Sequence, residues 1–153
     1  MGLTPQEIDR RLEAFLDVSR GEGMKVTHQR LEIFREVAST EEHPDAETIY
    51  TRVRTRIPTV SLDTVYRTLA WLERMGLVSR VHVLSERTRF DANMGPHHHF
   101  VCSRCGLIRD FTSPEADHLP VPEEVRAWGQ VHAVHVEFEG VCADCSADKE
   151  TQS

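Results

Sequence analysis

Long apolar segments are missing from this chain of 153 residues. No run approaches the roughly 20 consecutive apolar residues that a membrane-spanning helix needs. A secretory signal is missing too, so nothing in the sequence points to an oxidising compartment. We therefore expect a soluble, cytoplasmic protein without a membrane partner, and a length that allows one ordinary domain or two small ones.

Cysteine is scarce, and all four cysteines lie in two CxxC pairs. The pairs are Cys102-Ser-Arg-Cys105 and Cys142-Ala-Asp-Cys145, with 36 residues between them. Each pair places two soft thiolates on one tight turn, and two such turns can form a closed tetrahedral S4 site. Two disulfides or two independent redox motifs are the alternatives. Without a sign of an oxidising compartment, the spacing predicts one structural Zn2+ that holds distant parts of a domain together.

An excess of positive charge is missing as well, because the formal net charge is -7. This value argues at first sight against nucleic acid, but the acidity is confined to the C-terminal part. Up to Phe90 the chain has 14 basic and 14 acidic residues, and from Asp91 onward it has 4 basic and 11 acidic residues. Residues 49–90 hold eight arginines against three acidic residues. This local excess predicts a phosphate-facing surface, with a solvated arginine-rich helix face as the alternative.

Four short helices are expected in the N-terminal half, from capping residues and from apolar side chains at helical spacing. Their expected starts are Thr4, Thr27, the His43-Pro44 pair and Ser61, and Gly76 marks the end of the fourth. A strand with Val78, Val81 and Val83 should follow, with Thr88 and Phe90 returning across a Ser85-Glu86-Arg87 turn. Helices followed by a two-stranded hairpin predict a winged helix-turn-helix DNA-binding domain over residues 1–90.

The helix that begins at Ser61 is expected to enter the major groove of double-stranded DNA. Its expected outward residues are Ser61, Thr64, Tyr66, Arg67 and Thr68. Arg67 can contact guanine or phosphate, and Tyr66 can reach a phosphate or a thymine methyl group. Arg80, Arg87 and Arg89 of the hairpin would extend this surface. A partly buried core position is the alternative for Tyr66.

Residues 91–153 are expected to form a small α/β domain, so that the whole chain belongs to the α+β class. Short strands should flank the first CxxC pair at residues 100–101 and 107–108, and a helix should follow Pro122. The alternation of Val134, Val136 and Phe138 predicts a strand that leads into Cys142. So small a domain needs a structural metal, and burial of one face against a second subunit, to be stable.

Three consecutive histidines, His97 to His99, stand just before the first CxxC pair. In an extended segment His97 and His99 point to one side and His98 to the other. Asp91 lies six residues before His97, and Asp110 lies eleven residues after His99. Two imidazoles and two carboxylates form an N/O site that suits Fe2+, Mn2+ or Zn2+. A run of surface histidines is the alternative.

Four stretches of the sequence resemble the ferric uptake regulator (Fur) family. They are Val26-Thr27-His28-Gln29-Arg30, the His43-Pro44 helix start, Ser61-Leu62-Asp63-Thr64-Val65-Tyr66-Arg67-Thr68-Leu69, and His97-His98-His99-Phe100-Val101-Cys102-Ser103-Arg104-Cys105-Gly106. The second CxxC pair falls where that family has it, and the resemblance covers nearly the whole chain. It implies a homodimeric bacterial metalloregulator with an N-terminal winged helix, a C-terminal dimerisation domain and a structural zinc site of four cysteines.

Within this family the chain most resembles the peroxide-sensing (PerR) branch, in which three histidines and two aspartates hold the regulatory metal. The matching residues here are His43, Asp91, His97, His99 and Asp110. Aspartate at both carboxylate positions favours this branch, because the iron- and zinc-uptake branches commonly have glutamate at one of them. The resemblance implies a repressor with regulatory Fe2+ or Mn2+ that releases DNA after iron-catalysed oxidation of ligand histidines. An iron-, manganese- or zinc-responsive uptake repressor is the alternative.

A third metal site of the iron-uptake branch is not expected here. One of its histidines would align at Val134, which in this chain is flanked by His132 and His135. A distorted version would draw on Asp117, on His98 or His118, and on His132 or His135.

Two alternatives come from other functional classes, a zinc-dependent enzyme and a metal-storage module. The metalloprotease motif HExxH is absent from the sequence, and storage does not account for a helix-turn-helix half. We therefore expect a regulator rather than an enzyme.

Overall fold

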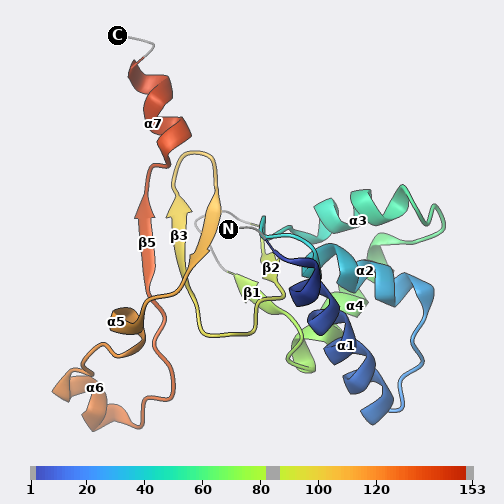
Figure 1. Ribbon diagram of the computed structural model, residues 1–153, viewed down its shortest axis with the longest axis horizontal. Helices are drawn as coiled ribbons and strands as arrows, with labels where there is room; N and C mark the ends of the chain where they lie inside the picture. Colours follow the sequence, from blue (N-terminus) through green and yellow to red (C-terminus); the bar gives the residue numbers. More distant parts are fainter. Residues whose placement is uncertain (1–2, 82–86, 151–153) are drawn as a thin grey trace. The chain divides into compact units, whose positions relative to one another are not determined.

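The computed structural model describes residues 3–81 and 87–150, with side chains described up to residue 148 (Figure 1). Contacts divide the chain into two units, Met1–Met94 and Gly95–Ser153. Asp91, which the expected boundary at residue 90 assigns to the C-terminal domain, therefore lies with the N-terminal unit. Among the described helices, none has the length and apolar composition needed to cross a membrane.

Four helices form most of the first unit. They are α1 (Pro5–Gly21), α2 (His28–Ala38), α3 (Ala46–Arg54) and α4 (Leu62–Arg74). Each begins at a side chain that accepts a backbone N–H three residues later, and these caps are Thr4, Thr27, Asp45 and Ser61. Such a cap satisfies one of the unpaired donors of the first turn and contributes about 1 kcal/mol. Three starts are as predicted, and the third lies slightly later, because Asp45 rather than Pro44 supplies the capping oxygen.

The helices of the first unit enclose one apolar core. Phe15 of α1 is stacked on Phe34 of α2 at a centroid distance of 5.1 Å and meets the edge of Trp71 of α4 at 6.2 Å. Ile49 of α3 and Leu69 of α4 are buried in the same cluster. These positions recur at helical spacing, which explains why the amphipathic pattern located the helices correctly.

A two-stranded antiparallel sheet completes the first unit. It pairs β1 (Ser79–Val81) with β2 (Arg89–Asp91). Val83, Ser85 and Glu86 of the expected hairpin lie outside the described residues. Strand β2 is also attached to the segment before α3, because the Phe90 N–H donates to the Pro44 carbonyl at 3.0 Å.

The second unit has a three-stranded sheet and three short helices. The strands are β3 (His98–Cys102), β4 (Ile108–Phe111) and β5 (Glu137–Gly140), in the order β4-β3-β5. The helices are α5 (Pro114–Asp117), α6 (Glu123–Trp128) and α7 (Ala143–Glu150). Strand β3 is antiparallel to β4 and parallel to β5. The expected helix after Pro122 is α6.

The expected strand at Val134 begins later than predicted. Its backbone ladder with β3 starts at the pair His99 and Glu137. Just before this point the Val136 N–H donates to Nδ1 of the His98 side chain at 3.1 Å instead of to a strand neighbour. Alternating valines therefore indicated the direction of the chain correctly but placed the start of the strand too early.

Candidate metal centres and DNA-facing helix

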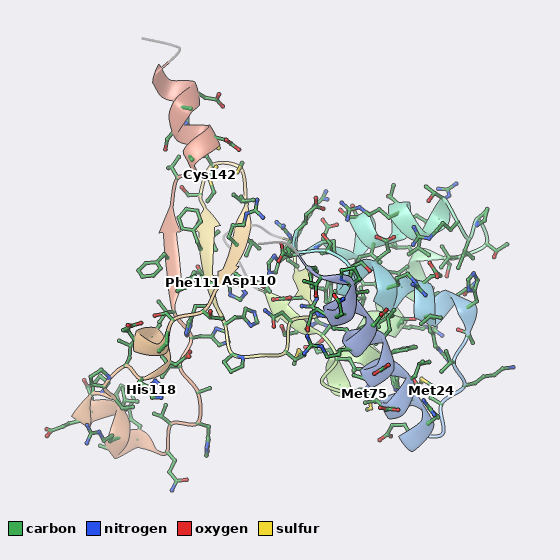
Figure 2. All side chains as sticks on the ribbon, in the orientation of Figure 1. Met24, Met75, Asp110, Phe111, His118 and Cys142 are labelled. Carbon is green, nitrogen blue, oxygen red and sulfur yellow. The ribbon has the colours of Figure 1, made fainter. Side chains whose placement is uncertain are left out.

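The four cysteines gather at one end of the sheet in the second unit. Cys102 ends β3, and Cys142 lies between β5 and α7 (Figure 2). Parallel pairing of these strands brings the two CxxC turns together, and the four Sγ atoms lie within 4.8 Å of one another. The Sγ atoms of Cys105 and Cys142 are 3.8 Å apart, close to the spacing of about 3.8 Å that four sulfurs at 2.3 Å from one zinc require.

All four thiols are free, so the disulfide alternative is wrong for this structure. Backbone N–H groups of Cys142 and then Cys105 lower the pKa of Cys102 to about 6. Hydrogen bonds among the neighbouring sulfurs raise the pKa of Cys145 to about 12. A cluster of four thiols thus forms its first thiolate at Cys102, and Zn2+, which binds thiolates, can replace the remaining protons. This donor set fits a structural zinc.

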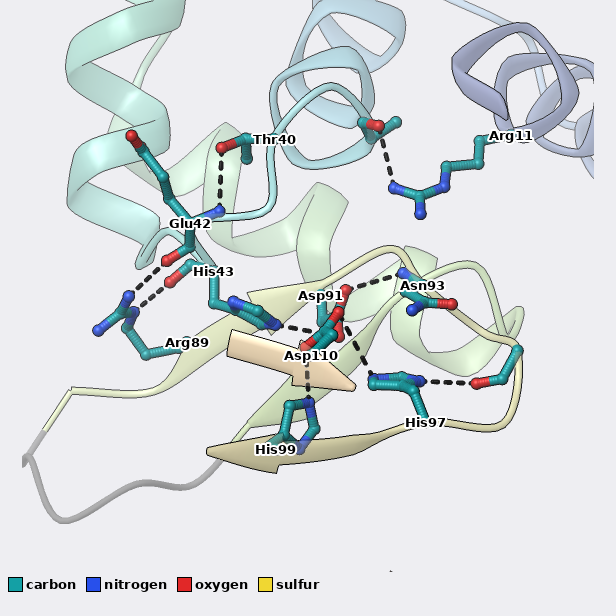
Figure 3. Close-up of polar contacts among 12 residues, drawn as sticks. Arg11, Thr40, Glu42, His43, Arg89, Asp91, Asn93, His97, His99 and Asp110 are labelled. Carbon is teal, nitrogen blue, oxygen red and sulfur yellow. Dashed lines mark hydrogen bonds and ion pairs between the residues drawn. The ribbon is translucent and has the colours of Figure 1, made fainter. Parts of the chain in front are cut away.

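In the first unit, His43 and Asp91 form a buried imidazole-carboxylate pair. Nε2 of His43 lies 3.2 Å from Oδ2 of Asp91 (Figure 3). Oδ1 of Asp91 accepts the Asn93 N–H at 2.8 Å, which fixes the orientation of the carboxylate. The Arg89 side chain donates to the backbone carbonyls of Glu42 and His43. The pair therefore offers one nitrogen donor and one oxygen donor whose positions are fixed by these hydrogen bonds.

In the second unit, His97, His99 and Asp110 form a cluster of two imidazoles and one carboxylate. The antiparallel register places Asp110 opposite His99, and Nε2 of His99 lies 3.2 Å from Oδ1 of Asp110. Nε2 of His97 lies 4.0 Å from the other carboxylate oxygen, while its Nδ1 is 2.6 Å from the Gly95 carbonyl (Figure 3). Only Nδ1–H can donate to that carbonyl, so Nε2 keeps the lone pair that a metal binds.

The chemistry of both clusters fits a divalent metal that prefers nitrogen and oxygen. Imidazole and carboxylate are the usual protein ligands of Fe2+, Mn2+ and Zn2+ in such sites. The three consecutive histidines are all buried, with 8% or less of each exposed, so they are not a run of surface histidines.

His98 and His135 lie in the second unit near this cluster but in a different chemical role. Nε2 of His98 lies 2.8 Å from Oδ1 of Asp117. Strand alternation predicts that His98 points to the side opposite His97 and His99, and this contact agrees with it. The ring of His135 is stacked on His99, with centroids 6.0 Å apart. Burial, and then the charges of the neighbouring histidines, lower the pKa of His135. Sequence reasoning considered His135 only for a third site and missed its place against His99, although a histidine just before a strand was a usable signal.

The residues considered for a distorted third site belong to the second unit. Within residues 3–81 and 87–150, no metal-binding group of three or more His, Cys, Asp or Glu side chains includes Asp117, His118, His132 or His135.

The helix expected to face DNA is α4, and most of its expected outward residues are accessible. Tyr66 is 51% exposed, so the core alternative for this residue is wrong, and Ser61 and Arg67 are exposed as well. Thr64 is half-buried. Thr68, expected to face outward, is buried, because it shares one helical stripe with core residues of α4.

Arg80 of β1 and Arg87, which precedes β2, form ion pairs within the first unit. Nε of Arg80 lies 2.5 Å from the Glu73 carboxylate, and its guanidinium lies over the Phe90 ring. Arg87 forms ion pairs with Asp45 and Glu47 at 3.2 and 3.4 Å. Part of the local positive charge predicted from the sequence is therefore compensated.

The chain is similar in sequence to known proteins. The sequence model of the Ferric uptake regulator family matches residues 21–139. The peroxide-responsive repressor PerR of Staphylococcus epidermidis is 31% identical over 144 residues, which cover 94% of this chain and 95% of the relative.

Two solved structures have a similar fold. The Campylobacter jejuni peroxide stress regulator has a TM-score of 0.65 at 29% identity, covering 85% of this chain and 98% of that one. The Helicobacter pylori ferric uptake regulator Fur has a TM-score of 0.75 at 23% identity, covering 91% and 93%, and its likeness concerns the fold alone.

Proposed function

Since this chain belongs to the ferric uptake regulator family of metal-responsive transcription regulators, we propose that it is a homodimeric repressor that releases operator DNA in response to peroxide. The observation that carries this proposal is the pairing of each aspartate with imidazole inside its own unit, Asp91 with His43 and Asp110 with His99. Aspartate at both positions is the pattern of the peroxide-sensing branch, and the Staphylococcus epidermidis relative is a peroxide-responsive repressor.

One regulatory Fe2+ or Mn2+ would use five side chains as ligands. These are His43, Asp91, His97, His99 and Asp110. The first two belong to the first unit and the other three to the second, so one ion that binds all five links the units. To turn a linked arrangement from rare into dominant, the metal must prefer it by about 5.5 kcal/mol. In a dimer, this link would set the spacing of two DNA-binding units.

Peroxide sensing follows from the position of the imidazoles. Bound Fe2+ would catalyse the two-electron oxidation of a ligand imidazole by hydrogen peroxide, whereas bound Mn2+ would be far less reactive. His43 or His97 gains one oxygen atom at a ring carbon, and the other oxygen of the peroxide leaves as water. An oxidised imidazole is a poorer ligand, so the metal is lost and the repressor releases DNA.

The remaining parts of the chain have supporting functions in this proposal. The four cysteines hold one structural Zn2+ that stabilises the second unit, which forms the homodimer. The first unit binds double-stranded operator DNA as a winged helix-turn-helix, with α4 in the major groove. Its DNA contacts are Ser61, Thr64, Tyr66, Arg67 and Arg80.

The test is peptide mass spectrometry after a low dose of hydrogen peroxide, with Fe2+-loaded and Mn2+-loaded protein compared. We expect one added oxygen on His43 or His97 in the iron form only, together with loss of operator binding. His118, which is exposed and outside the ligand set, is the internal control and should stay unmodified. If the iron form keeps unmodified ligands and still binds DNA, an iron-, manganese- or zinc-responsive uptake repressor is the better assignment.

A zinc-dependent enzyme is the alternative from a different class. The chain contains one His-x-Glu triplet, His135-Val136-Glu137, of the kind that zinc deaminases use. Glu137 is an exposed residue of β5, and the family to which the chain belongs consists of transcription regulators. Retention of operator DNA that depends on added metal separates a regulator from both an enzyme and a storage module.

A further inference from the structure

We propose that a hollow beside α4 holds one phosphate of the DNA backbone, an inference that rests on the proposed DNA binding. The hollow has a volume of about 320 Å³ and lies in the first unit. Three arginines line it, Arg30 of α2 and both Arg67 and Arg74 of α4, and none of the described residues that line it carries a carboxylate. Three guanidinium groups around one concavity favour an anion, and phosphate matches their paired N–H donors.

The hollow has a rigid floor and charged walls. Thr64, Arg67, Trp71 and Arg74 recur along one face of α4, and Trp71 of this face is also part of the apolar core. Trp71 is 8% exposed and meets the Phe15 ring edge-on, so it forms a fixed base. Met24, which follows α1 by three residues, also lines the hollow. The arginines therefore project from a surface that does not need to reorganise around a ligand.

Two of the arginines are ready to bind an anion. Nη1 of Arg30 donates to the Lys25 carbonyl at 2.7 Å, which orders this side chain before any ligand arrives. Arg67 is paired with Asp63 at 2.9 Å, but 81% and 69% of the two side chains are exposed. So exposed an ion pair contributes little, and a phosphate can replace the carboxylate.

A DNA phosphate suits this site better than a free anion because of where the hollow lies. It shares Thr64 and Arg67 with the surface of α4 that is expected to face the major groove. Backbone phosphates border that groove, and contacts to them fix the register of a protein without reading the sequence. The hollow thus lies between the start of α2 and the part of α4 that is expected to face the bases.

The test measures how DNA affinity depends on salt in the metal-loaded protein. Arg30→Gln and Arg74→Gln should each weaken binding to operator and to scrambled duplex alike. Each change should also reduce the slope of log K against log salt by about 0.9, the value for one phosphate contact. Arg10→Gln is the matched control, because Arg10 is an exposed arginine of α1 paired with Glu7 at 2.9 Å. It should leave affinity and slope unchanged.

Each outcome decides between the proposals. If wild-type protein binds operator but both variants keep its salt slope, the phosphate site is refuted while DNA binding stands. If wild-type protein with metal does not bind operator, the proposed function fails, and the phosphate site fails with it. A free-anion site is shown if inorganic phosphate raises the melting temperature of wild type but not of Arg74→Gln, with salt slopes unchanged. This result also overturns the DNA contact.

Independently, we infer from a different set of contacts that Arg89 positions His43 for metal binding. Within residues 3–81 and 87–150, His43 is the only non-glycine residue with positive φ, at 55°. Such a backbone persists only where its surroundings hold it. The Arg89 side chain donates to the carbonyls of Glu42 and His43, so it holds both sides of this residue. The next residue, Phe90, donates its N–H to Pro44 at 3.0 Å.

These contacts connect β2 to the segment that carries His43. Arg89 fixes the backbone of His43, and Asp91, two residues further along β2, lies against its ring. The separation of the two donors therefore depends on Arg89, although this side chain is itself no ligand. Groups that orient metal ligands in this way typically contribute 10- to 100-fold to metal affinity.

The test compares Arg89→Met with Arg87→Met, a change of the arginine two residues before Arg89, outside β2. Arg89→Met should weaken Mn2+ affinity about 10- to 100-fold, at a temperature where circular dichroism shows the metal-free variant folded. Arg87→Met should bind Mn2+ like wild type, and Arg89→Lys should recover part of the loss. Unchanged Mn2+ affinity in folded Arg89→Met, or an equal loss in Arg87→Met, would overturn the inference.

Discussion

The imidazole of His98 donates from Nε2 to the carboxylate of Asp117, 2.8 Å away. Its Nδ1 accepts the N–H of Val136 at 3.1 Å, and an imidazole nitrogen that accepts carries no proton, so Nε2 must be the donor. Both ring nitrogens are thus used within the second unit. This bond joins β3 to α5 and leaves His98 without a free lone pair for a metal.

We therefore expect two metals per chain, one Zn2+ at the cysteines and one regulatory ion. Native mass spectrometry after loading with excess Mn2+ or Zn2+ and removal of weakly bound ions should show two. Asp117→Asn should keep both, since an amide oxygen can still accept from Nε2–H of His98. If wild type binds a third ion and Asp117→Asn does not, the expectation of two metals is wrong and a third site includes Asp117.

Loss of the zinc site should unfold the second unit. Cys142→Ser should reduce zinc from about one per chain to none, because a structural site needs all four ligands, and the dimer should dissociate. Elemental analysis and light scattering under reducing conditions measure both effects. Ser103→Ala is the matched control, because Ser103 lies in the first CxxC turn and its backbone N–H keeps its 2.8 Å bond to the Gly140 carbonyl when the hydroxyl is removed. A folded, zinc-free dimer of Cys142→Ser would contradict the expectation.

The thiols of zinc-free protein should react in a defined order. Backbone N–H donors lower the pKa of Cys102 to about 6, so this thiol is mainly ionised at pH 7. The neighbouring sulfurs raise the pKa of Cys145 to about 12, which keeps it protonated. Brief alkylation with iodoacetamide at pH 7 should label Cys102 before Cys145, and peptide mass spectrometry reads the order. Zinc-loaded protein should be protected at both positions.

Specific recognition of DNA should depend on α4. Arg67→Ala should weaken operator binding by roughly 1–3 kcal/mol if this side chain contacts a base, and scrambled DNA should be affected less. Tyr66→Phe should also weaken operator binding, with zinc and Mn2+ content unchanged. Fluorescence anisotropy on both duplexes measures the difference. Equal affinity of both variants and wild type would mean that another face of the first unit reads the sequence.

The cap of α3 should stabilise the first unit in a pH-dependent way. Asp45→Ala should cost about 1 kcal/mol of unfolding free energy, because the Thr48 N–H loses its acceptor. Burial alone would raise the pKa of Asp45, but hydrogen bonds from Thr48 and Arg87 lower it below 3.8. The stabilisation is therefore complete above pH 3.8 and is lost as pH falls through the folded-state pKa. Urea denaturation of wild type and Asp45→Asn should give curves that converge as the solution is acidified.

Local chemistry explains which elements the sequence could predict. The helices of the first unit were predictable because Thr4, Thr27 and Ser61 are strong caps in front of apolar side chains at helical spacing. Helix α5 has only four residues and was not predicted, since one turn is too short for a periodic pattern. The start of β5 was placed too early because a bond from Val136 to a side chain far away in the sequence cannot be seen in the valine alternation.

The sequence could predict which residues are metal donors but not which side chains hold those donors in position. Two CxxC pairs and the histidine run identify ligands from spacing alone, and the register of β3 and β4 adds Asp110 beside His99. The hold of Arg89 on His43 was not predictable, because it joins residues 46 positions apart through backbone carbonyls. Thr68 was misplaced because a hydroxyl was taken as a sign of exposure, although its helical position lies on the core stripe.

The parallel pairing of β3 with β5 also means that the two CxxC pairs are synthesised at different times on the ribosome. Cys102 and Cys142 are 40 residues apart, which corresponds to about 2 to 8 s at roughly 5–20 residues per second. Helices α1 to α4 contact one another within the first unit and can pack during this interval. The N-terminal unit can therefore fold in the nascent chain before the second pair, Cys142 and Cys145, has been synthesised. If the four cysteines hold zinc as proposed, the closed site can form only after the second pair has been synthesised.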